Sequence, residues 1–351
     1  MNMREQRFDL IKGVAIFLVV IGHVLTFCIR EIDNAFLFKI VAAVHMPLFF
    51  FVSGWFSYKE GFRSPDLLKR FRQLIVPGLI CMTLFFFAFP HTGVGTPFPK
   101  TYESAIATSG KYGYWFVFTL FMITIYYWVI TKIVSFINSE KLKYAVVIIL
   151  SLLVFTFTNI ENLWTQALCM DFASLYFPPF IFGVLARKNR SGFENLCNNG
   201  YVYMSSLIIG CFCFYPLTYS WEFPGLQTAI RFATPVLHIC LAIVAMPLFT
   251  NWEKTAFSPD SSALGRSSAR MWAYIGRNSL GIYLLHYFFL FPMGVLQEPM
   301  RELHCGIIPT LTVSAFVASV IIAVVLLVIK ILSPSPQLSE LLTGTLTAKR
   351  K

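Results

Sequence analysis

The chain has 351 residues, of which 57% are hydrophobic and 13% are charged, and its net charge is +11. Soluble domains carry about 25% charged residues, so this composition excludes an ordinary soluble globular protein. We expect no nucleic-acid partner, because the distribution of basic residues between loops explains the charge better. The sequence predicts an all-α, polytopic integral membrane protein with almost no extramembrane domain.

Apolar segments long enough to cross a bilayer, about 20 residues each, recur along almost the whole chain. The first is not expected to be a cleaved signal peptide, because it is long, further apolar segments follow it and it has no clear small-residue cleavage site. We predict ten spans, at residues 8–29, 36–56, 74–90, 114–136, 144–158, 170–187, 201–219, 231–250, 273–293 and 308–332.

The loop charges predict the orientation of these spans. Six of the 28 Lys and Arg residues fall on one side of the predicted membrane, namely Arg30, Lys39, Lys100, Lys111, Arg231 and Arg301. The other 22 fall on the opposite side, and basic loops are typically cytoplasmic, so both termini are predicted to be cytoplasmic. We expect residues 1–335 to form a single transmembrane domain, with a short, basic and mobile cytoplasmic tail at 336–351.

Each of the first two spans carries a histidine, His23 and His45. A polar ring inside a span is costly, so it indicates a functional site or an interhelical hydrogen bond. Lys12 is expected near the membrane edge, and eleven residues of helix place His23 roughly 16 Å further on, near the bilayer midplane. If His45 returns to a similar depth, the two imidazoles can face one another.

The first span also carries two opposite charges, Asp9 and Lys12, and Arg7 precedes them. Residues three apart share a helix face, so Asp9 and Lys12 can pair. Lys12 and His23 are close to three turns apart and fall on roughly one face. A neutral imidazole suits general base catalysis near pH 7. The alternative is that Lys12 only marks the positive cytoplasmic boundary and that the histidines are neutral and hydrogen-bonded between helices.

The second span continues as His45-Met46-Pro47 and, later, Ser53. Proline inside a helix frees a backbone carbonyl and permits a kink. A kink beside His45, with Ser53 about two turns further on, would form a polar recess. The alternative is a packing kink in which Ser53 bonds to its own helix.

A basic cluster in the loop 57–73 comprises Lys69, Arg70 and Arg72. Clustered cations at an inner membrane surface can bind phosphates or anionic lipid headgroups. A nucleotide-bearing donor would fit this cluster, and a simple positive anchor is the alternative. The chain has no Walker-type or GxGxxG loop, so no ATPase or Rossmann phosphate site is expected.

Two later stretches add candidate pocket residues. Tyr114 and Trp115 begin the fourth span, where an aromatic belt is the alternative to a site. Asn278, Tyr283 and His286 lie in the ninth span, and the helical spacing of Asn278 and His286 predicts a face turned towards the interior of the bundle. For His286, a third site imidazole and an interhelical hydrogen bond remain equal alternatives.

The remaining potential metal ligands form no pattern. The eight cysteines are scattered, no CxxC occurs, and we expect them to be packing residues and expect no metal site. His91 and His304 fall in predicted outer loops, and the sequence indicates no partner for them or for His238.

Several of these stretches resemble the membrane-bound acyltransferase-3 family. DLIKGVAIFLVVIGH, with Lys12 and His23, resembles its opening signature of a basic residue, ten residues and His. HMPLFFFVSG resembles the next block in the branch of fucose-4-O-acetylase-like proteins. KRFRQLIVP, the Trp115-Phe116 pair and SLGIYLLH resemble three further blocks. The chain has Lys12 where arginine is commoner. No fused extracytoplasmic hydrolase-like domain is expected, so acceptor choice is expected to come from the membrane part or a partner.

The resemblance implies a ten-span O-acetyltransferase of the bacterial cytoplasmic membrane. Such enzymes move an acyl group, usually acetyl, from acyl-CoA to a hydroxyl of lipopolysaccharide, capsule or another lipid-linked glycan. It implies His23 as the acid/base residue with Lys12 as its basic partner, and Lys69 and Arg72 as donor-binding cations. Acetyl-CoA is then a co-substrate and no bound cofactor is expected.

Further details and other functions remain open. His45 and Ser53 could hold the acceptor or the developing oxyanion. A proton-coupled transporter or exporter of glycan intermediates could use the same histidines as proton carriers. A non-catalytic scaffold for polysaccharide assembly is a third hypothesis. Contacts with membrane lipids are expected. The sequence leaves open whether the protein forms a homo-oligomer and which sugar is the acceptor. It also leaves open whether the acyl group passes directly to the acceptor or through an acyl-enzyme relay.

Overall fold

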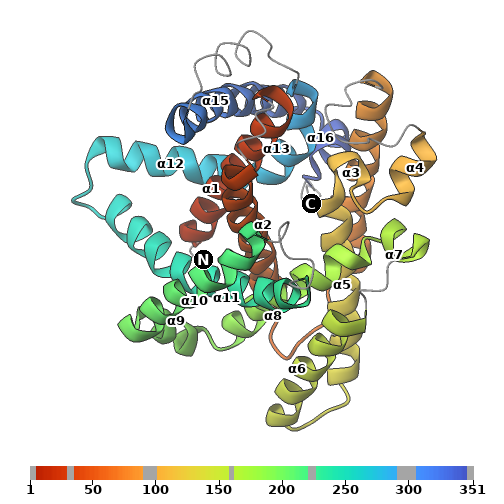
Figure 1. Ribbon diagram of the computed structural model, residues 1–351, viewed down its shortest axis with the longest axis vertical. Coiled ribbons are helices and arrows are strands. Elements are labelled where there is room, and N and C mark those ends of the chain that lie inside the picture. Colours follow the sequence, from red (N-terminus) through yellow and green to blue (C-terminus); the bar gives the residue numbers. More distant parts are fainter. Residues whose placement is uncertain are drawn as a thin grey trace. The chain divides into compact units, whose positions relative to one another are not determined.

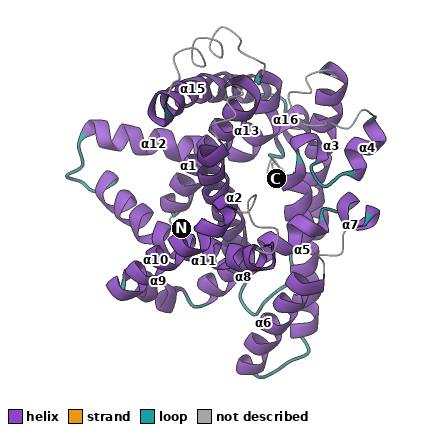
Figure 2. Cartoon of the chain, viewed as in Figure 1, coloured by secondary structure: helices purple, strands orange, loops and turns teal. Residues whose placement is uncertain are grey.

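The structure is a computed structural model that describes residues 5–29, 35–89, 101–157, 162–219, 227–290 and 306–345. Within these ranges every regular element is a helix (Figure 2), which confirms the predicted all-α class. The chain forms two compact units, each described here by itself. Unit 1 comprises residues 1–49 and 197–339, and unit 2 comprises residues 50–196 and 340–351. His91 and His304 lie outside the described residues.

The helices of unit 1 are α1 (Gln6–His23), η1 (Val24–Ile29), most of α2 (Ala35–Ser57), α10 (Gly200–Tyr219), α11 (Gln227–Ala256), α12 (Ala263–Arg277), α13 (Ser279–Leu285), η5 (His286–Phe289) and α15 (Ile307–Leu332). Figure 1 labels the α-helices among them. Unit 2 contains α3 (Leu67–Ala88), α4 (Tyr102–Ala107), η3 (Lys111–Gly113), α5 (Trp115–Val134), α6 (Glu140–Phe157), α7 (Leu163–Ala167), α8 (Met170–Lys188) and most of α9 (Arg190–Asn198). The short helix α16 (Pro336–Thr343) crosses the boundary between the two sets of residues.

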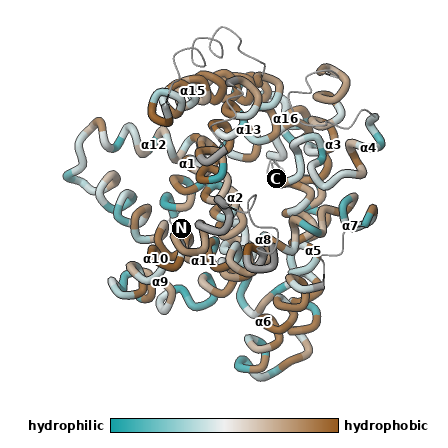
Figure 3. Tube along the Cα trace, viewed as in Figure 1, coloured by the Kyte–Doolittle hydropathy of each residue, from teal (hydrophilic) through white to brown (hydrophobic). Residues whose placement is uncertain are grey.

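Six of the described helices are long and apolar enough to cross a membrane, at Gln6–Cys28, Leu37–Ser57, Leu67–Ala88, Trp115–Val134, Phe232–Ala256 and Ile307–Leu332. Figure 3 shows the apolar stretches along the trace. The other four predicted spans coincide with α6, α8, α10 and the α12–α13 region. The exact number of ten spans and the cytoplasmic termini therefore stay predictions.

Helix α1 is the centre of unit 1. Phe8, Leu10 and Ile11 are each at most 1% exposed although they point to different sides of the helix. A helix that is apolar on all sides is buried by its neighbours. For α1 these neighbours are α11, α12, α13 and α15. The first predicted span is thus an internal helix of its unit, and its polar residues face other helices.

Two glycines allow α1 and α12 to approach very closely. A Cβ atom added at Gly13 would lie 2.3 Å from the backbone oxygen of Trp272, and one at Gly276 would lie 1.8 Å from that of Asp9. Neither position has room for any side chain. Small residues at such crossings let membrane helices pack backbone to backbone. This contact fixes the start of α1 against the end of α12.

The ninth predicted span, 273–293, is not one continuous helix over its described residues 273–290. Helix α12 ends at Arg277, α13 begins at Ser279, and Asn278 between them has φ −98° and ψ 9°. The Asn278 side-chain amide donates to the Tyr274 carbonyl oxygen, 2.9 Å away. A short amide that bonds to nearby backbone favours a helix end over a helix interior, which accounts for the break.

In unit 2 the end of α2 packs on α8 through a second pair of glycines. A Cβ atom at Gly54 would lie 1.9 Å from the Phe180 backbone oxygen, and one at Gly183 would lie 2.1 Å from that of Phe51. Trp55 is 1% exposed beside this contact. Gly54 therefore has a packing role directly after Ser53.

The expected mobile tail is corrected in part, because residues 336–343 form helix α16. The Arg72 guanidinium donates to the Glu340 carboxylate at 2.5 Å, and the Cys81 thiol lies 3.6 Å from the Leu342 carbonyl oxygen. These contacts attach the second half of α16 to α3 within unit 2.

An ion-pair cluster lies where α6 begins and α8 ends. The Glu140 carboxylate accepts from Lys143 Nζ at 2.7 Å and from Lys188 Nζ at 2.6 Å. Lys188 Nζ also lies 4.1 Å from the centre of the Tyr144 ring. The hydrogen bonds from Lys143 and Lys188 lower the pKa of Glu140 from 4.5 to about 2.

This lowered pKa predicts how Glu140 stabilises the protein at different pH values. A carboxylate with a lowered pKa in the folded state stabilises it above the ordinary pKa of 4.5, and this contribution is lost as pH falls towards 2. We expect the melting temperature of Glu140→Gln in detergent to fall below that of the wild type at pH 7, and the difference to shrink steadily below pH 4.5. A difference that stays constant with pH would contradict this.

Candidate functional site

His23 is the last residue of α1, where the helix changes its winding. Residues 24–29 continue as a π-helix, and the Thr26 hydroxyl donates to the Gly22 carbonyl oxygen at 2.8 Å. π-Helical segments are rare and occur frequently at functional sites, because they reorient the side chains beside them. The histidine predicted from sequence thus lies at an irregular point of an otherwise regular span.

Three rings meet at this point within unit 1. The Tyr287 hydroxyl and His23 Nε2 share a hydrogen bond of 3.0 Å. The centre of the His286 ring lies 5.1 Å from that of His23 and 4.3 Å from that of Tyr287. The centre of the Phe27 ring lies 5.8 Å from that of His23 and 6.2 Å from that of Tyr287. His286 and Tyr287 are at most 2% exposed, whereas His23 is half-buried.

This group of His23, His286 and Tyr287, termed here the histidine cluster, is suited to proton transfer. A phenol hydroxyl and an imidazole nitrogen at 3.0 Å form a direct path for a proton. The tyrosine hydroxyl can donate to His23 Nε2 or accept from it, so the pair can pass a proton in either direction. The structure thus places the His286 ring in contact with that of His23.

Tyr287 is a residue that the sequence interpretation missed. It directly follows His286, and adjacent residues point to different faces of a regular helix. The available signal was a second polar ring within an apolar stretch, HYFF. Residues 286–289 form a short 3-10 turn after α13. The α-helical spacing assumed for the whole predicted span therefore did not indicate that Tyr287 faces His23.

His45 lies on α2, in the part of that helix that belongs to unit 1. It is 8% exposed, and its Nδ1 donates to the carbonyl oxygen of Val41 on the same helix. The Val41 side chain in turn lies 3.4 Å from where a Cβ of Gly22 would be. Helix α2 thus meets the end of α1 near His23, and His45 is held by its own helix.

The predicted charge pair is present at the other end of α1. Lys12 Nζ donates to the Asp9 carboxylate at 2.9 Å, with 4% of the Asp9 side chain exposed and 23% of that of Lys12. Arg7 donates to Thr250 Oγ1 at 3.2 Å and to the Glu5 carboxylate at 2.9 Å. Asp9 thus pairs with Lys12, and Arg7 attaches α1 to α11.

The two candidate residues between Asn278 and His286 differ in position. The Asn278 side chain bonds to the carbonyl of Tyr274 and ends helix α12, so it is used by its own helix. Tyr283 is 4% exposed, and its ring centre lies 6.0 Å from that of His286. Tyr283 therefore borders the histidine cluster.

The basic cluster belongs to unit 2 and lies in the first turns of α3. The Lys69 amide donates to the Asp66 carboxylate, which caps the helix. Arg72 is paired with Glu340, and its side chain is 56% exposed. Arg70 is half-buried. Lys69 and Arg72 thus present cationic groups at an accessible surface of this unit.

Ser53, Tyr114 and Trp115 also belong to unit 2. The Ser53 carbonyl oxygen accepts from the Ser57 hydroxyl at 2.7 Å. Tyr114 is fully buried. The Trp115 ring stacks on Tyr176 at 5.5 Å and contacts Phe172 at 4.6 Å. Trp115 is therefore part of an aromatic cluster that joins α5 to α8.

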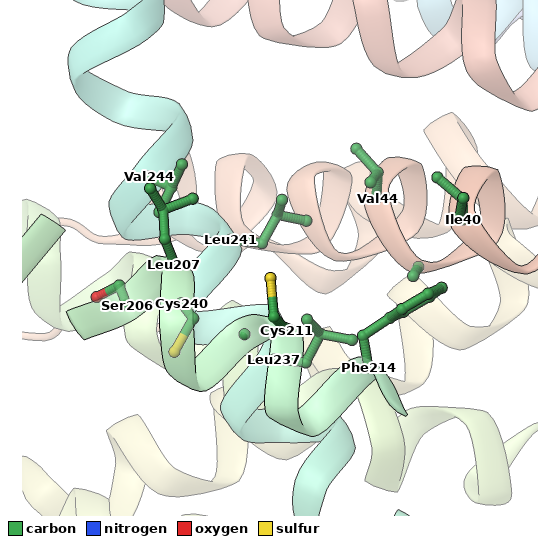
Figure 4. Close-up of a pocket in the computed structure, with 12 residues that line it drawn as sticks. Ile40, Val44, Ser206, Leu207, Cys211, Phe214, Leu237, Cys240, Leu241 and Val244 are labelled. Carbon is green, nitrogen blue, oxygen red and sulfur yellow. The ribbon is translucent and has the colours of Figure 1, made fainter. Parts of the chain in front are cut away.

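An apolar groove of about 380 Å³ lies elsewhere in unit 1, between α2, α10 and α11 (Figure 4). Its walls include Ile40, Val44, Leu207, Cys211, Leu237 and Leu241. Such a surface fits hydrocarbon and offers no acid or base, so the groove supplies no chemistry to the cluster. Among the described residues no group of three or more His, Cys, Asp or Glu side chains is placed to hold a metal ion.

Imidazole and phenol side chains packed together inside a helical membrane protein indicate a functional site. The profile of the acyltransferase-3 family, described as an acyltransferase domain, matches residues 5–329 of the chain. The protein belongs to this family and is an acyltransferase. The match includes both compact units.

Two curated relatives are nodulation proteins named NolL. That of Mesorhizobium japonicum is 32% identical over 133 residues, which is 34% of this chain and 34% of the relative. That of Sinorhizobium fredii is 38% identical over 90 residues, which is 24% of this chain and 25% of the relative. The matched region thus spans about a third or less of each relative. No solved structure matches the chain.

Proposed function

We propose that this acyltransferase is an O-acetyltransferase of the cytoplasmic membrane, which moves acetyl from acetyl-CoA to a hydroxyl of a surface-glycan or lipid-linked sugar. The observation that carries the proposal is the contact between His23, at the position of the family signature, and a second buried imidazole and a phenol. The ten-span topology with cytoplasmic termini belongs to the same proposal, because it makes the basic cluster accessible to a cytoplasmic donor.

In the proposed reaction His23 removes the proton of the acceptor hydroxyl while its oxygen attacks the thioester carbonyl carbon. The new O–C bond forms, the C–S bond breaks, and the proton passes from His23 to the sulfur of the departing CoA. The CoA phosphates would bind Lys69 and Arg72, with Arg70 beside them. Lys12, paired with Asp9, would lie between the cytoplasmic face and His23 along α1.

The direct test is the release of CoA by the purified protein. Acetyl-CoA is supplied with a panel of methyl glycosides that begins with methyl fucoside, and free thiol and acetylated sugar are measured together. We expect CoA release that depends on the sugar and yields a product heavier by one acetyl group. A protein that binds these compounds but releases no CoA with any acceptor would exclude the proposal and favour the transporter alternative.

A further inference from the structure

His286 is held by its own helix in one tautomer. The side chain is 0% exposed, and Nδ1 lies 2.7 Å from the Tyr283 carbonyl oxygen and 3.0 Å from that of Ile282. A carbonyl oxygen can only accept a hydrogen bond, so Nδ1 carries the proton. In the neutral ring Nε2 is therefore an acceptor with a free lone pair.

This acceptor is buried, and the described part of the chain supplies no donor for it. Buried polar atoms nearly always have a hydrogen-bond partner, because an unpaired one loses its hydrogen bonds to water without forming new ones in the protein. The missing partner must be a donor, such as a hydroxyl. The centre of the His286 ring lies 5.1 Å from that of His23 and 4.3 Å from that of Tyr287, so this donor would lie at the histidine cluster.

His23 differs in this respect. Its Nε2 already shares a hydrogen bond with Tyr287. Of these two rings, only His286 has an Nε2 that makes no hydrogen bond with the described residues. Its orientation is fixed by backbone atoms of α13, so the nitrogen is preorganised for a ligand.

We propose that His286 Nε2 accepts a hydrogen bond from a hydroxyl of the acceptor sugar, which makes His286 a further catalytic residue. The proposal rests on the proposed function and adds no covalent step. The hydrogen bond holds the sugar against the histidine cluster so that the attacking oxygen lies within reach of His23. Specificity follows, because a sugar without that hydroxyl would leave the buried nitrogen unpaired.

Two substitutions separate the two nitrogens of the ring. The amide of asparagine reaches the position of Nδ1, so His286→Asn keeps a donor for the carbonyls of Ile282 and Tyr283 and removes only the group at Nε2. His286→Gln places an amide oxygen near the position of Nε2. Wild type and both variants are assayed with acetyl-CoA and methyl fucoside, and their melting temperatures in detergent are recorded.

We expect His286→Asn to fold like the wild type, to keep its KM for acetyl-CoA, and to lose about 10- to 100-fold in kcat/KM for methyl fucoside. His286→Gln is expected to recover part of this loss. Equal activity of His286→Asn and wild type would overturn the proposal and would indicate a buried water at Nε2. Loss of folding in His286→Asn alone would also overturn it, because the fold would then need Nε2. If the wild type itself releases no CoA with any sugar, the proposed function has failed, whatever the variants do.

Discussion

Replacement of His23 by alanine is expected to lower the rate of acetyl transfer by about 10²- to 10⁴-fold, the range typical of one well-placed general acid or base. The ring lies at the end of α1 and touches both other members of the histidine cluster. Its removal takes away the base and also the hydrogen-bond partner that Tyr287 has on α1. Binding of acetyl-CoA is expected to change little, because the proposed donor-binding cations belong to α3.

The matched control is His238→Ala, which removes a buried histidine of unit 1 on α11. CoA release and sugar acetylation are measured for both variants at equal amounts of folded, membrane-inserted protein. We expect His238→Ala to keep most of the wild-type kcat. Normal acetylation by His23→Ala would end the assignment of His23 as the acid/base residue.

Gly276→Ala is expected to be the most damaging single change to the fold of unit 1. The added methyl would lie 1.8 Å from the Asp9 backbone oxygen, and backbone cannot rotate away as a side chain can. Overpacking typically costs about 1–3 kcal/mol, and we expect the upper end of this range or more. Because α13 follows α12 after one residue, separation of α1 from α12 also moves His286 and Tyr287 away from His23.

The Gly276→Ala prediction is tested by the melting temperature in detergent and by kcat for acetyl transfer, both of which should fall. The control is Gly200→Ala, at the start of α10, where an added Cβ meets nothing within 4 Å. Alanine is the better helix former, so this variant should be neutral or slightly stabilised. Equal stability of the two variants would show that the closeness of α1 and α12 is not needed.

Local spacing was a sound guide wherever a contact lies within one helix. The Asp9–Lys12 pair is an example, because residues three apart on an α-helix are neighbours whatever the rest of the chain does. His23 was also identified as a buried polar ring in a span. The cost of such a ring in hydrocarbon is a property of the residue and its apolar surroundings, both visible in the sequence.

The partner of His23 is a different case. His286 was a candidate because Asn278 and His286 appeared to share one face of an unbroken helix, yet the helix ends at Asn278. The helix ends where the Asn278 side-chain amide bonds to nearby backbone in place of the helical hydrogen bonds. The spacing of polar residues along the sequence does not show this competition. Tyr287 was missed because helical spacing places it, as the residue after His286, on a different face of the helix from His286.

By itself, the sequence determined that this is a helical membrane protein with His23, His45 and the Asp9–Lys12 pair on its first two spans, because apolar length and helical spacing are local properties. Only the tertiary structure decided that His286 and Tyr287 meet His23 and that Nε2 of His286 is left without a partner in the described chain. These contacts join residues more than 260 positions apart. They depend on how closely α1 and α12 pack, and that distance is set by two glycines whose role appears only when the helices are placed together.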